Sequence, residues 1–301
     1  MKATIIGANG YIGKHLTMYL YDLNFDLFLY DLSHKFCFDG DFNYNSIDIS
    51  NKQSIININV DVDYIFFMSG LTGTYKGFED YENFILVNEI SLLHVLDRLK
   101  NLNTKPIFIF PSTRLVYKGK KNIPLNEQST KEFKTIYALN KWNGEQLLHQ
   151  YSLYFGIKYI IFRIGVPYGN NFNNTYSFGT LGNFLNQVTK NNTIILYGDG
   201  SLKRTFTHIH DICFQIITIL GNSRIKNETY NIAGETFSLK KIAQLISLKY
   251  KTKIKFTEWP ENDLKIESGD TIFNSSKIRR ELLYKSEYKL KKWIESLPNR
   301  L

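Results

Sequence analysis

The sequence has 301 residues, of which 43% are hydrophobic and 22% are charged. This length can bury a core without disulfide or metal staples, and the composition excludes an intrinsically disordered chain. The formal net charge of +9 comes from dispersed lysines without a long basic run, so we expect a solvated basic surface and no nucleic-acid partner.

The first residues predict a buried strand that runs directly into a glycine turn. Residues 1–10 read MKATIIGANG, without the apolar region of a signal peptide, and no stretch of the sequence is apolar for long enough to span a bilayer. The two cysteines, Cys37 and Cys213, lie far apart without metal-ligand spacing, which fits a reducing compartment. We therefore expect a cytoplasmic protein with no membrane partner and no metal site.

The first half of the chain alternates short apolar runs with helical patterns. We predict strands at Ala3–Ile6, Asp26–Tyr30, Tyr64–Met68, Ile107–Phe110 and Tyr159–Phe162. We predict helices at Tyr11–Tyr21, Ile55–Ile58, Phe84–Lys100 and Glu132–Phe155. This alternation predicts an α/β protein with the doubly wound parallel sheet of a Rossmann fold. Because the strands are continuously apolar, we expect both faces of the sheet to be covered.

The alternation stops at about residue 165, after a last predicted strand of the sheet. The stretch 165–179 is rich in Gly and Asn, and it is followed by predicted helices at Leu181–Val188, Ile209–Leu220 and Leu239–Leu248 and a strand at Thr193–Tyr197. We expect a Rossmann domain over residues 1–165, to which part of the later chain returns. Residues 166–301 are expected to form mainly a smaller C-terminal α/β substrate-binding lobe.

The glycine turn after the first strand has the spacing of a dinucleotide-binding motif. Gly7, Gly10 and Gly13 would permit a tight turn, let a pyrophosphate approach the backbone and open a helix whose first N–H groups hold phosphate oxygens. Asp31 follows the second strand at about the expected 20-residue spacing. A carboxylate there accepts the adenosine ribose hydroxyls of NAD and repels the extra phosphate of NADP; a plain turn residue is the alternative. Asp48 is a weaker candidate for the adenine amino group, with helix capping as its alternative.

A catalytic tyrosine and lysine are predicted in the long helix after the fifth strand. Of four Tyr-x-x-x-Lys pairs, only Tyr137 and Lys141 lie inside a long helical pattern. The spacing puts both side chains on one helix face, where the ammonium should lower the pKa of the phenol and make it a base for an alcohol. Ser112 and Thr113 end the preceding strand, where a hydroxyl can bond the reacting oxygen; for each of them, a turn hydroxyl is the alternative.

These motifs together resemble the extended short-chain dehydrogenase/reductase family, in its nucleotide-sugar epimerase/dehydratase branch. The resemblance spans nearly the whole chain and rests on Gly7–Gly13, Asp31, Asp48-Ile49, Asn88, Ser112–Tyr117, Tyr137–Lys141, Arg163, Pro167–Gly169, Tyr197–Gly200, Arg204–Asp211 and Tyr230–Gly234. It implies NAD as cofactor, a nucleotide-diphosphate sugar as substrate and a place in polysaccharide biosynthesis. It also implies a homodimer formed through the helices at Phe84–Lys100 and Glu132–Phe155.

The resemblance further implies roles for individual residues. The catalytic set would be Thr113, Tyr137 and Lys141. The cofactor would be bound by Gly7, Asn9, Gly10, Tyr11, Ile12, Gly13, Asp31, Asp48, Ile49, Ser69, Asn88, Ser112, Tyr137 and Lys141. The substrate would be contacted by Thr72, Arg114, Tyr137, Asn183, Tyr197 and Arg204. Arg204 would hold the diphosphate, which a guanidinium can bind in a bidentate manner; a surface charge after a turn is the alternative.

Departures from the family pattern narrow the expected reaction. Arg114 and Leu115 stand where the dehydratases of this branch carry Asp-Glu, so a 4,6-dehydratase is not expected. An arginine often found before the late Gly-Asp pair is missing upstream of Gly269, and the loop Ser69–Thr74 is unusual. We expect an epimerase that inverts C4 through a transient 4-keto sugar. The alternatives are an NAD(P)H-dependent reductase of a nucleotide-linked 4-keto (6-deoxy) sugar and a non-catalytic dinucleotide-sensing or RNA-binding relative.

Overall fold

The computed structural model describes residues 1–169, 179–222, 224–282 and 287–299, so most of the Gly- and Asn-rich stretch at 165–179 lies outside the described residues. The chain divides into two compact units. Unit 1 comprises Met1–Val116, Thr135–Arg163 and Leu220–Tyr230. Unit 2 comprises Tyr117–Lys134, Ile164–Ile219 and Asn231–Leu301.

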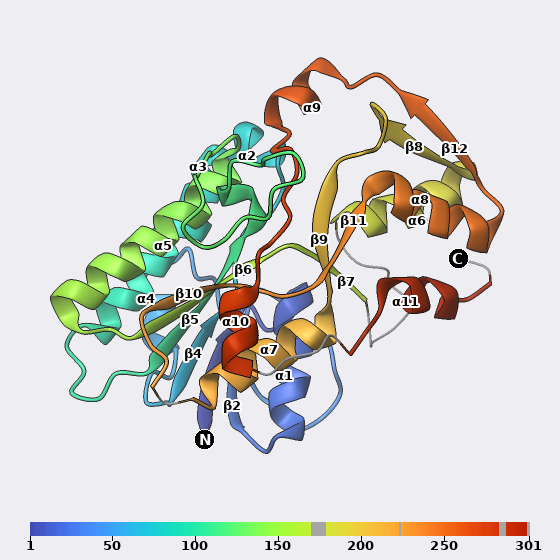
Figure 1. Ribbon diagram of the computed structural model, residues 1–301. Helices are drawn as coiled ribbons and strands as arrows, with labels where there is room; N and C mark the ends of the chain where they lie inside the picture. The colour runs from blue at the N-terminus through green and yellow to red at the C-terminus, as the bar shows by residue number, and fades with distance from the viewer. Residues whose placement is uncertain (170–178, 223, 283–286, 300–301) are drawn as a thin grey trace. The chain divides into compact units, whose positions relative to one another are not determined.

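Unit 1 is built around a seven-stranded sheet of order β10-β6-β5-β4-β1-β2-β3 (Figure 1). Its strands are β1 (Lys2–Ile6), β2 (Asp26–Asp31), β3 (Asn43–Ser46), β4 (Tyr64–Phe67), β5 (Ile107–Thr113), β6 (Tyr159–Ile164) and β10 (Glu228–Asn231). The pairs β1–β2, β1–β4, β2–β3 and β4–β5 are parallel. The strand order reverses beside β1, and in such sheets ligands bind at this reversal, beyond the carboxyl ends of the strands.

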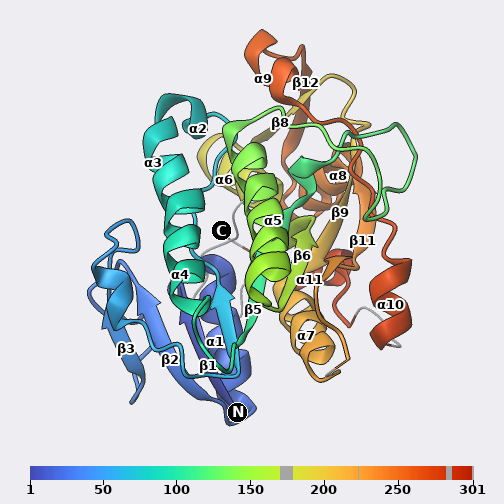
Figure 2. The same ribbon diagram turned by 90° about the vertical axis from the view of Figure 1, so that its left-hand side faces the viewer.

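Helices cover both faces of this sheet, with α1 on one face and α3, α4 and α5 on the other (Figure 2). The helical segments are α1 (Tyr11–Asp22), a 3₁₀ turn (Ser54–Asn57), α2 (Lys76–Glu79), α3 (Tyr81–Ile85), a π-helical turn (Leu86–Ile90), α4 (Ser91–Leu99), a 3₁₀ turn (Arg114–Val116) and α5 (Ile136–Phe155). Buried side chains such as Phe67, Leu96, Phe108 and Leu148 form the core on the α4 and α5 side. The predicted doubly wound fold is confirmed.

Unit 2 has two small sheets, β11-β9-β7 and β12-β8. Its strands are β7 (Val166–Tyr168), β8 (Thr193–Tyr197), β9 (Lys203–His208), β11 (Glu235–Ser238) and β12 (Lys253–Thr257). Its helices are α6 (Gly179–Asn191), α7 (Ile209–Leu220), α8 (Leu239–Tyr250), α9 (Glu261–Ile266), α10 (Ser276–Leu282) and α11 (Leu290–Ser296). Residues of α6, α8 and α11, among them Phe184, Ile246 and Ile294, form a separate core with the strands.

Two predicted helices begin three or more residues away from their observed starts. α5 begins at Ile136 instead of Glu132, because the Thr135 hydroxyl caps it by accepting a hydrogen bond from the Ala138 N–H at 3.1 Å. The residues before this cap belong to the Tyr117–Lys134 segment of unit 2. The helix predicted from Phe84 starts earlier, at Tyr81, and contains the π-helical turn.

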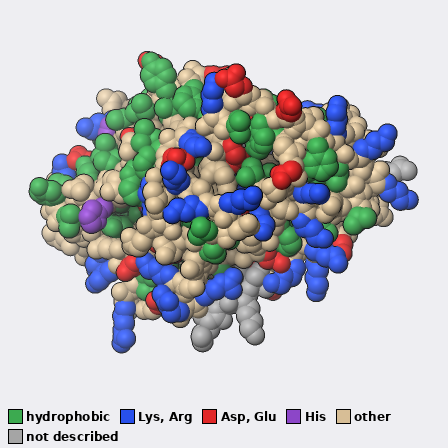
Figure 3. Space-filling model, turned by 45° about the horizontal axis from the view of Figure 1, so that its top comes forward, with side chains coloured by type: hydrophobic (Ala, Val, Ile, Leu, Met, Phe, Trp, Pro, Cys, Tyr) green, Lys and Arg blue, Asp and Glu red, His purple; other side chains and the backbone are tan. Residues whose placement is uncertain are grey.

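The surface is basic but mixed in charge. Figure 3 shows lysine and arginine side chains spread among acidic and uncharged ones over the visible face, in keeping with the predicted solvated basic surface. Within the described parts of the chain, no helix combines the length and the hydrophobicity needed to cross a bilayer.

Candidate active site

The glycine turn after β1 is packed so tightly that two of its residues cannot carry a side chain. Gly7 has a φ of +90°, and a Cβ on it would lie 2.5 Å from the Ser69 backbone nitrogen. A Cβ on Gly13 would lie 2.0 Å from the Gly7 oxygen. Gly10 is different: it is exposed, and a Cβ there would approach only the Gly7 oxygen, at 3.2 Å. The missing side chain of Gly10 therefore leaves open backbone at the start of α1, which fits a pyrophosphate.

Asp31 lies at the end of β2 and is tied to the glycine turn. Its Oδ2 accepts a hydrogen bond from the Asn9 N–H at 3.0 Å, and its Oδ1 accepts one from the Ser33 N–H at 3.2 Å. The Asn9 side chain donates to the Lys35 carbonyl at 2.9 Å and accepts from the Cys37 N–H at 2.9 Å. The predicted adenosine end of the cofactor site is therefore one connected network, with Asp31 partly exposed.

Tyr44 joins this network and was not predicted from the sequence. Its hydroxyl donates to the Ser33 carbonyl at 2.5 Å and lies 3.2 Å from the Asn9 side-chain nitrogen. Burial and the neighbouring Asp31 carboxylate raise the pKa of Tyr44 to about 12. No motif marks this tyrosine, because its proximity depends on how the loop after β2 folds back.

Asp48 and Ile49 are engaged in local structure. The Asp48 Oδ1 accepts hydrogen bonds from the Ser50 N–H at 2.9 Å and the Ser50 hydroxyl at 2.7 Å, which form a local turn. Asp48 does not cap a helix, because the next helical turn begins only at Ser54, so the capping alternative is wrong. The Ile49 side chain is buried in the core of unit 1.

Asn88 lies in the π-helical turn and fixes the loop that follows β4. Its Oδ1 accepts from the Leu71 N–H at 2.8 Å, and its Nδ2 donates to the Leu71 carbonyl at 3.1 Å. The same Nδ2 lies 3.3 Å from the Asn140 Oδ1 on α5. Asn88 thus positions the backbone of the unusual loop, on which Ser69 meets the glycine turn and Thr72 is exposed.

Thr113, Tyr137 and Lys141 come together at the carboxyl end of β5. The buried Thr113 ends the strand, Tyr137 lies in the first turn of α5, and Lys141 follows one helical turn later. The side chains of Thr113 and Tyr137 are hydrogen-bonded to each other. The Lys141 ammonium nitrogen lies 4.7 Å from the centroid of the Phe110 ring. The structure therefore unites the predicted hydroxyl, phenol and ammonium within unit 1.

The pKa of Tyr137 differs from the prediction. Most of the ring is enclosed by protein, and this burial raises the pKa to about 12, although the Thr113 hydrogen bond and the Arg114 charge act in the opposite direction. Burial also lowers the pKa of Lys141 to about 8, against the opposing effect of the Glu145 carboxylate. The predicted lowering of the phenol pKa is wrong for this structure, because the loss of hydration outweighs the neighbouring positive charge.

A buried ion pair lies close to Lys141, one of the three residues predicted to be catalytic. Glu145 accepts two hydrogen bonds from Arg163, from Nε to Oε1 at 2.9 Å and from Nη2 to Oε2 at 2.5 Å. The Ser112 hydroxyl donates to the same Oε1 at 2.5 Å. The hydroxyl proton of Ser112 is therefore used in its hydrogen bond to Glu145. Glu145 was missed from the sequence, although its position four residues after Lys141 on the same helix face was the available signal.

The residues predicted to contact the substrate are divided between the units. Arg114 and Thr72 lie in unit 1, and Asn183, Tyr197 and Arg204 lie in unit 2. Asn183 is exposed on α6, and Tyr197 is exposed at the end of β8 with its ring centroid 5.2 Å from that of Trp259. Arg204 on β9 is only 8% exposed, which contradicts the alternative of a plain surface charge.

Arg204 forms an ion pair that the sequence did not predict. Its Nη1 donates to the Thr180 hydroxyl at 2.9 Å, and its Nη2 donates to the Glu267 Oε2 at 2.8 Å. Glu267 lies two residues before Gly269, in the region where the sequence analysis expected an arginine. The guanidinium predicted to hold a diphosphate therefore already has a carboxylate partner.

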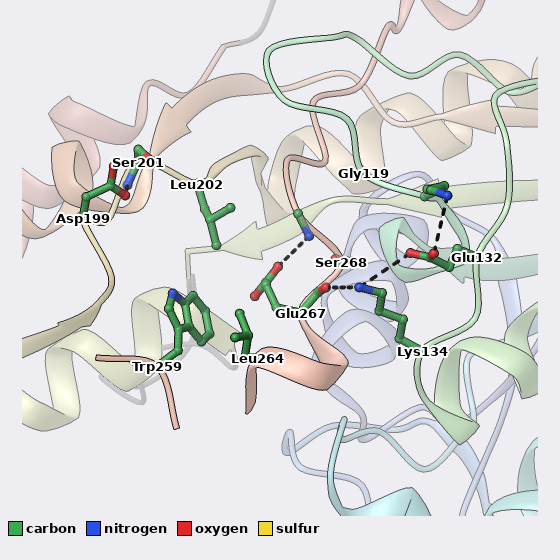
Figure 4. Close-up of a pocket in the computed structure, with 12 residues that line it drawn as sticks. Gly119, Glu132, Lys134, Asp199, Ser201, Leu202, Trp259, Leu264, Glu267 and Ser268 are labelled. Carbon is green, nitrogen blue, oxygen red and sulfur yellow. Dashed lines mark hydrogen bonds and ion pairs between the residues drawn. The ribbon is translucent and has the colours of Figure 1, made fainter. Parts of the chain in front are cut away.

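Glu267 also lines a cavity of about 450 Å³ within unit 2 (Figure 4). The Lys134 ammonium nitrogen donates to the Glu267 carbonyl at 2.8 Å and lies 3.7 Å from the Glu132 carboxylate. Trp259, Leu264 and Leu202 line the other side of the cavity. A volume of this size, with an apolar wall and a few charged groups, is typical of small-molecule sites.

Comparisons with known proteins identify the family to which this chain is similar. Residues 3–233 match a family model described as the NAD dependent epimerase/dehydratase family. An uncharacterized UDP-glucose epimerase of Bacillus subtilis is 27% identical over 268 residues, which cover 82% of this chain and 81% of that protein. A CDP-paratose 2-epimerase of Salmonella typhi is 24% identical over 308 residues, covering 90% of this chain and 91% of that protein.

Solved structures share the fold over nearly the whole chain. The UDP-glucose 4-epimerase of Thermotoga maritima, solved with UDP-glucose, superimposes with a TM-score of 0.85 at 18% identity, over 99% of this chain and 97% of that one. The UDP-glucuronic acid 4-epimerase of Bacillus cereus, solved with UDP-glucuronic acid and NAD, gives a TM-score of 0.83 at 21% identity, over 99% of this chain and 98% of that one.

Proposed function

Because the chain belongs to the NAD dependent epimerase/dehydratase family, we propose that it is a nucleotide-sugar epimerase that inverts C4 of the sugar. Family membership confirms the resemblance found in the sequence and identifies NAD as the cofactor. The substrate class, the position inverted and the roles of individual residues are our proposal.

One observation carries the proposal: the hydrogen bond between Thr113 and Tyr137 at the carboxyl end of β5, with Lys141 one helical turn away. These are the groups needed to move a proton on and off a sugar hydroxyl. Arg114 and Leu115 directly follow Thr113, so these two positions offer no carboxylate to eliminate water from the sugar. Oxidation followed by reduction at one carbon is therefore favoured over dehydration.

The residues present fit NAD. The open backbone at Gly10 and the start of α1 would hold the pyrophosphate, and Asp31 would accept the adenosine ribose hydroxyls. When bound, NAD supplies a hydride acceptor that returns the hydride in the second half of the cycle. The Asp31 carboxylate would repel the additional phosphate of NADP.

The chain's own residues would handle the proton. Thr113 would orient the reacting hydroxyl, and Tyr137 would take its proton in the first half and return it in the second. With a pKa of about 12, Tyr137 is a neutral phenol near pH 7, the form that donates a proton. The base half of the cycle requires the phenolate, so positive charge near the ring, such as that of Arg114, favours it.

The test is to incubate the purified protein with UDP-, GDP-, CDP- and dTDP-linked sugars. Proton NMR would report the configuration at every ring carbon, which matters because one relative is named a 2-epimerase. NADH absorbance would report net redox change. Inversion at C4 without net NADH formation would support the epimerase. A parallel incubation would contain NADH and a nucleotide-linked 4-keto sugar. Consumption of NADH there, without epimerisation of any sugar in the panel, would refute the epimerase in favour of the reductase.

We also propose a homodimer and a cytoplasmic location. Large apolar side chains are exposed on the helices predicted to form the dimer, namely Tyr81 (52%), Ile85 (40%), Leu153 (67%) and Tyr154 (80%). These side chains would be covered if the helices of two copies of the chain packed together. Analytical ultracentrifugation of the wild-type protein and a Leu153→Glu variant would test the dimer, which should dissociate in the variant.

A further inference from the structure

Two buried arginines of this chain form ion pairs that differ in the number of hydrogen bonds to the carboxylate. Arg163 uses Nε and Nη2, which lie on one edge of the guanidinium, to bind both oxygens of Glu145. Arg204 uses only Nη2 of that edge, toward one oxygen of Glu267. The first pair is the closed bidentate arrangement of a permanent structural contact, whereas the second leaves half of the edge open.

The open half is the Nε–H of Arg204. In the part of the chain that the structure describes, this buried nitrogen has no hydrogen-bond partner. The residue is 8% exposed, so water reaches it poorly. A buried donor without an acceptor destabilises the folded protein, which a permanent ion pair would be expected to avoid. The arrangement therefore suits an acceptor that arrives with a ligand.

The Glu267 carboxylate has a second hydrogen-bond partner that it can keep when it no longer pairs with Arg204. Its other oxygen, Oε1, accepts a hydrogen bond from the Gly269 N–H at 3.0 Å. Its side chain also borders the 450 Å³ cavity, which gives the carboxylate room to turn (Figure 4). The Glu267 carboxylate can thus leave the guanidinium without losing every partner.

We propose that Glu267 is a built-in competitor for Arg204 that the diphosphate of the substrate displaces. A phosphoryl group would take the Nε–Nη2 edge in a bidentate manner, and Glu267 would turn away on its Gly269 contact. Glu267 then sets how strongly the enzyme holds phosphate, and so its selectivity for a ligand with a diphosphate over the bare nucleoside. This inference rests on the proposed function, because it assumes that Arg204 meets the diphosphate.

The test is calorimetric titration of the full-length protein with UDP and, as a ligand without phosphate, uridine. Glu267→Gln keeps the shape and the acceptor for Gly269 but removes the competing charge. We expect it to bind UDP at least about tenfold more tightly, since close charge pairs couple strongly, and to bind uridine as the wild type does. The matched control is Glu261→Gln on α9, which removes an exposed charge paired with Lys265 at 2.6 Å and should leave both affinities unchanged.

A second series separates this inference from the proposed function. Arg204→Met should weaken UDP binding, and the double variant Arg204→Met/Glu267→Gln should show no gain over it. If Arg204→Met leaves UDP binding unchanged, the diphosphate lies elsewhere and the assignment of Arg204 fails. If Arg204→Met weakens binding but Glu267→Gln gives no gain, Glu267 orients Arg204 and the competition is refuted. If Glu267→Gln does not fold, Glu267→Asp is the alternative variant. Its shorter side chain moves the carboxylate away from Arg204, so it should tighten UDP binding several-fold. An unchanged affinity for UDP would refute the competition.

Discussion

Replacing Lys141 by Met should make the protein more stable at pH 7 and inactive. Lys141 is 6% exposed, and burial lowers its pKa from 10.5 to about 8. The difference of about 2.5 units corresponds to roughly 3 kcal/mol of destabilisation while the buried amine is charged. Methionine fills a similar volume without a charge, so the Lys141→Met variant should gain up to about 3 kcal/mol in free energy of unfolding.

The stability difference between Lys141→Met and the wild type should depend on pH, because the pKa of Lys141 is lower in the folded state than in the unfolded state. Below pH 8 lysine is protonated in both states, and the folded state bears the full penalty. Between pH 8 and 10.5 the unfolded state binds more protons than the folded state, so the wild type becomes relatively more stable as the pH rises. Above 10.5 the amine is neutral in both states. The advantage of Lys141→Met should therefore be complete at pH 7 and nearly absent at pH 10.5.

Urea unfolding followed by tryptophan fluorescence at several pH values would measure this difference. Comparing variant with wild type at each pH cancels the titration of all other groups. Lys158→Met, which removes a lysine at an exposed position just after α5, is the control and should leave the free energy of unfolding at pH 7 nearly unchanged. A Lys141→Met variant that is no more stable than the wild type at pH 7, or whose advantage does not change with pH, would refute the reasoning.

Three further predictions concern neighbouring residues. Tyr137→Phe should lower kcat by about 10²–10⁴-fold while NAD binding, measured by calorimetry, stays unchanged; undiminished turnover would remove the proposed base. Asp31→Ala should weaken NAD binding and reduce the preference over NADP, which fluorescence titration with both cofactors can follow; an unchanged preference would leave Asp31 as a turn residue. Glu145→Ala should cost about 3–5 kcal/mol of stability in urea because it strands Arg163, whereas Ser112→Ala should cost only about 1 kcal/mol; equal losses would contradict the assignment of the ion pair.

The sequence predicts best where one residue type is required by backbone geometry or helix spacing. Gly7 and Gly13 were identifiable because no side chain fits there, and Tyr137 and Lys141 because a spacing of four defines a helix face. The parallel sheet likewise follows from the alternation of strands and helices. These features depend on local chain geometry, which a sequence motif encodes directly.

Contacts that depend on tertiary folding were not predictable in the same way. Glu267 meets Arg204 across 63 residues of sequence, and Tyr44 reaches Asn9 across 35. The pKa of Tyr137 is set by how much of the ring is buried, which the Tyr-x-x-x-Lys spacing does not report. The start of α5 was misplaced because Thr135, rather than the hydrophobic pattern, determines where the helix begins.

The path of the chain has a consequence for how this protein could be cut or rearranged. The polypeptide passes between the two units five times, after Val116, Lys134, Arg163, Ile219 and Tyr230. A fragment ending near residue 165 would lack β10, the edge strand that closes the seven-stranded sheet. Neither unit is therefore encoded by one continuous stretch of sequence, so exchanging either unit with that of a relative would require joining the chain at several points.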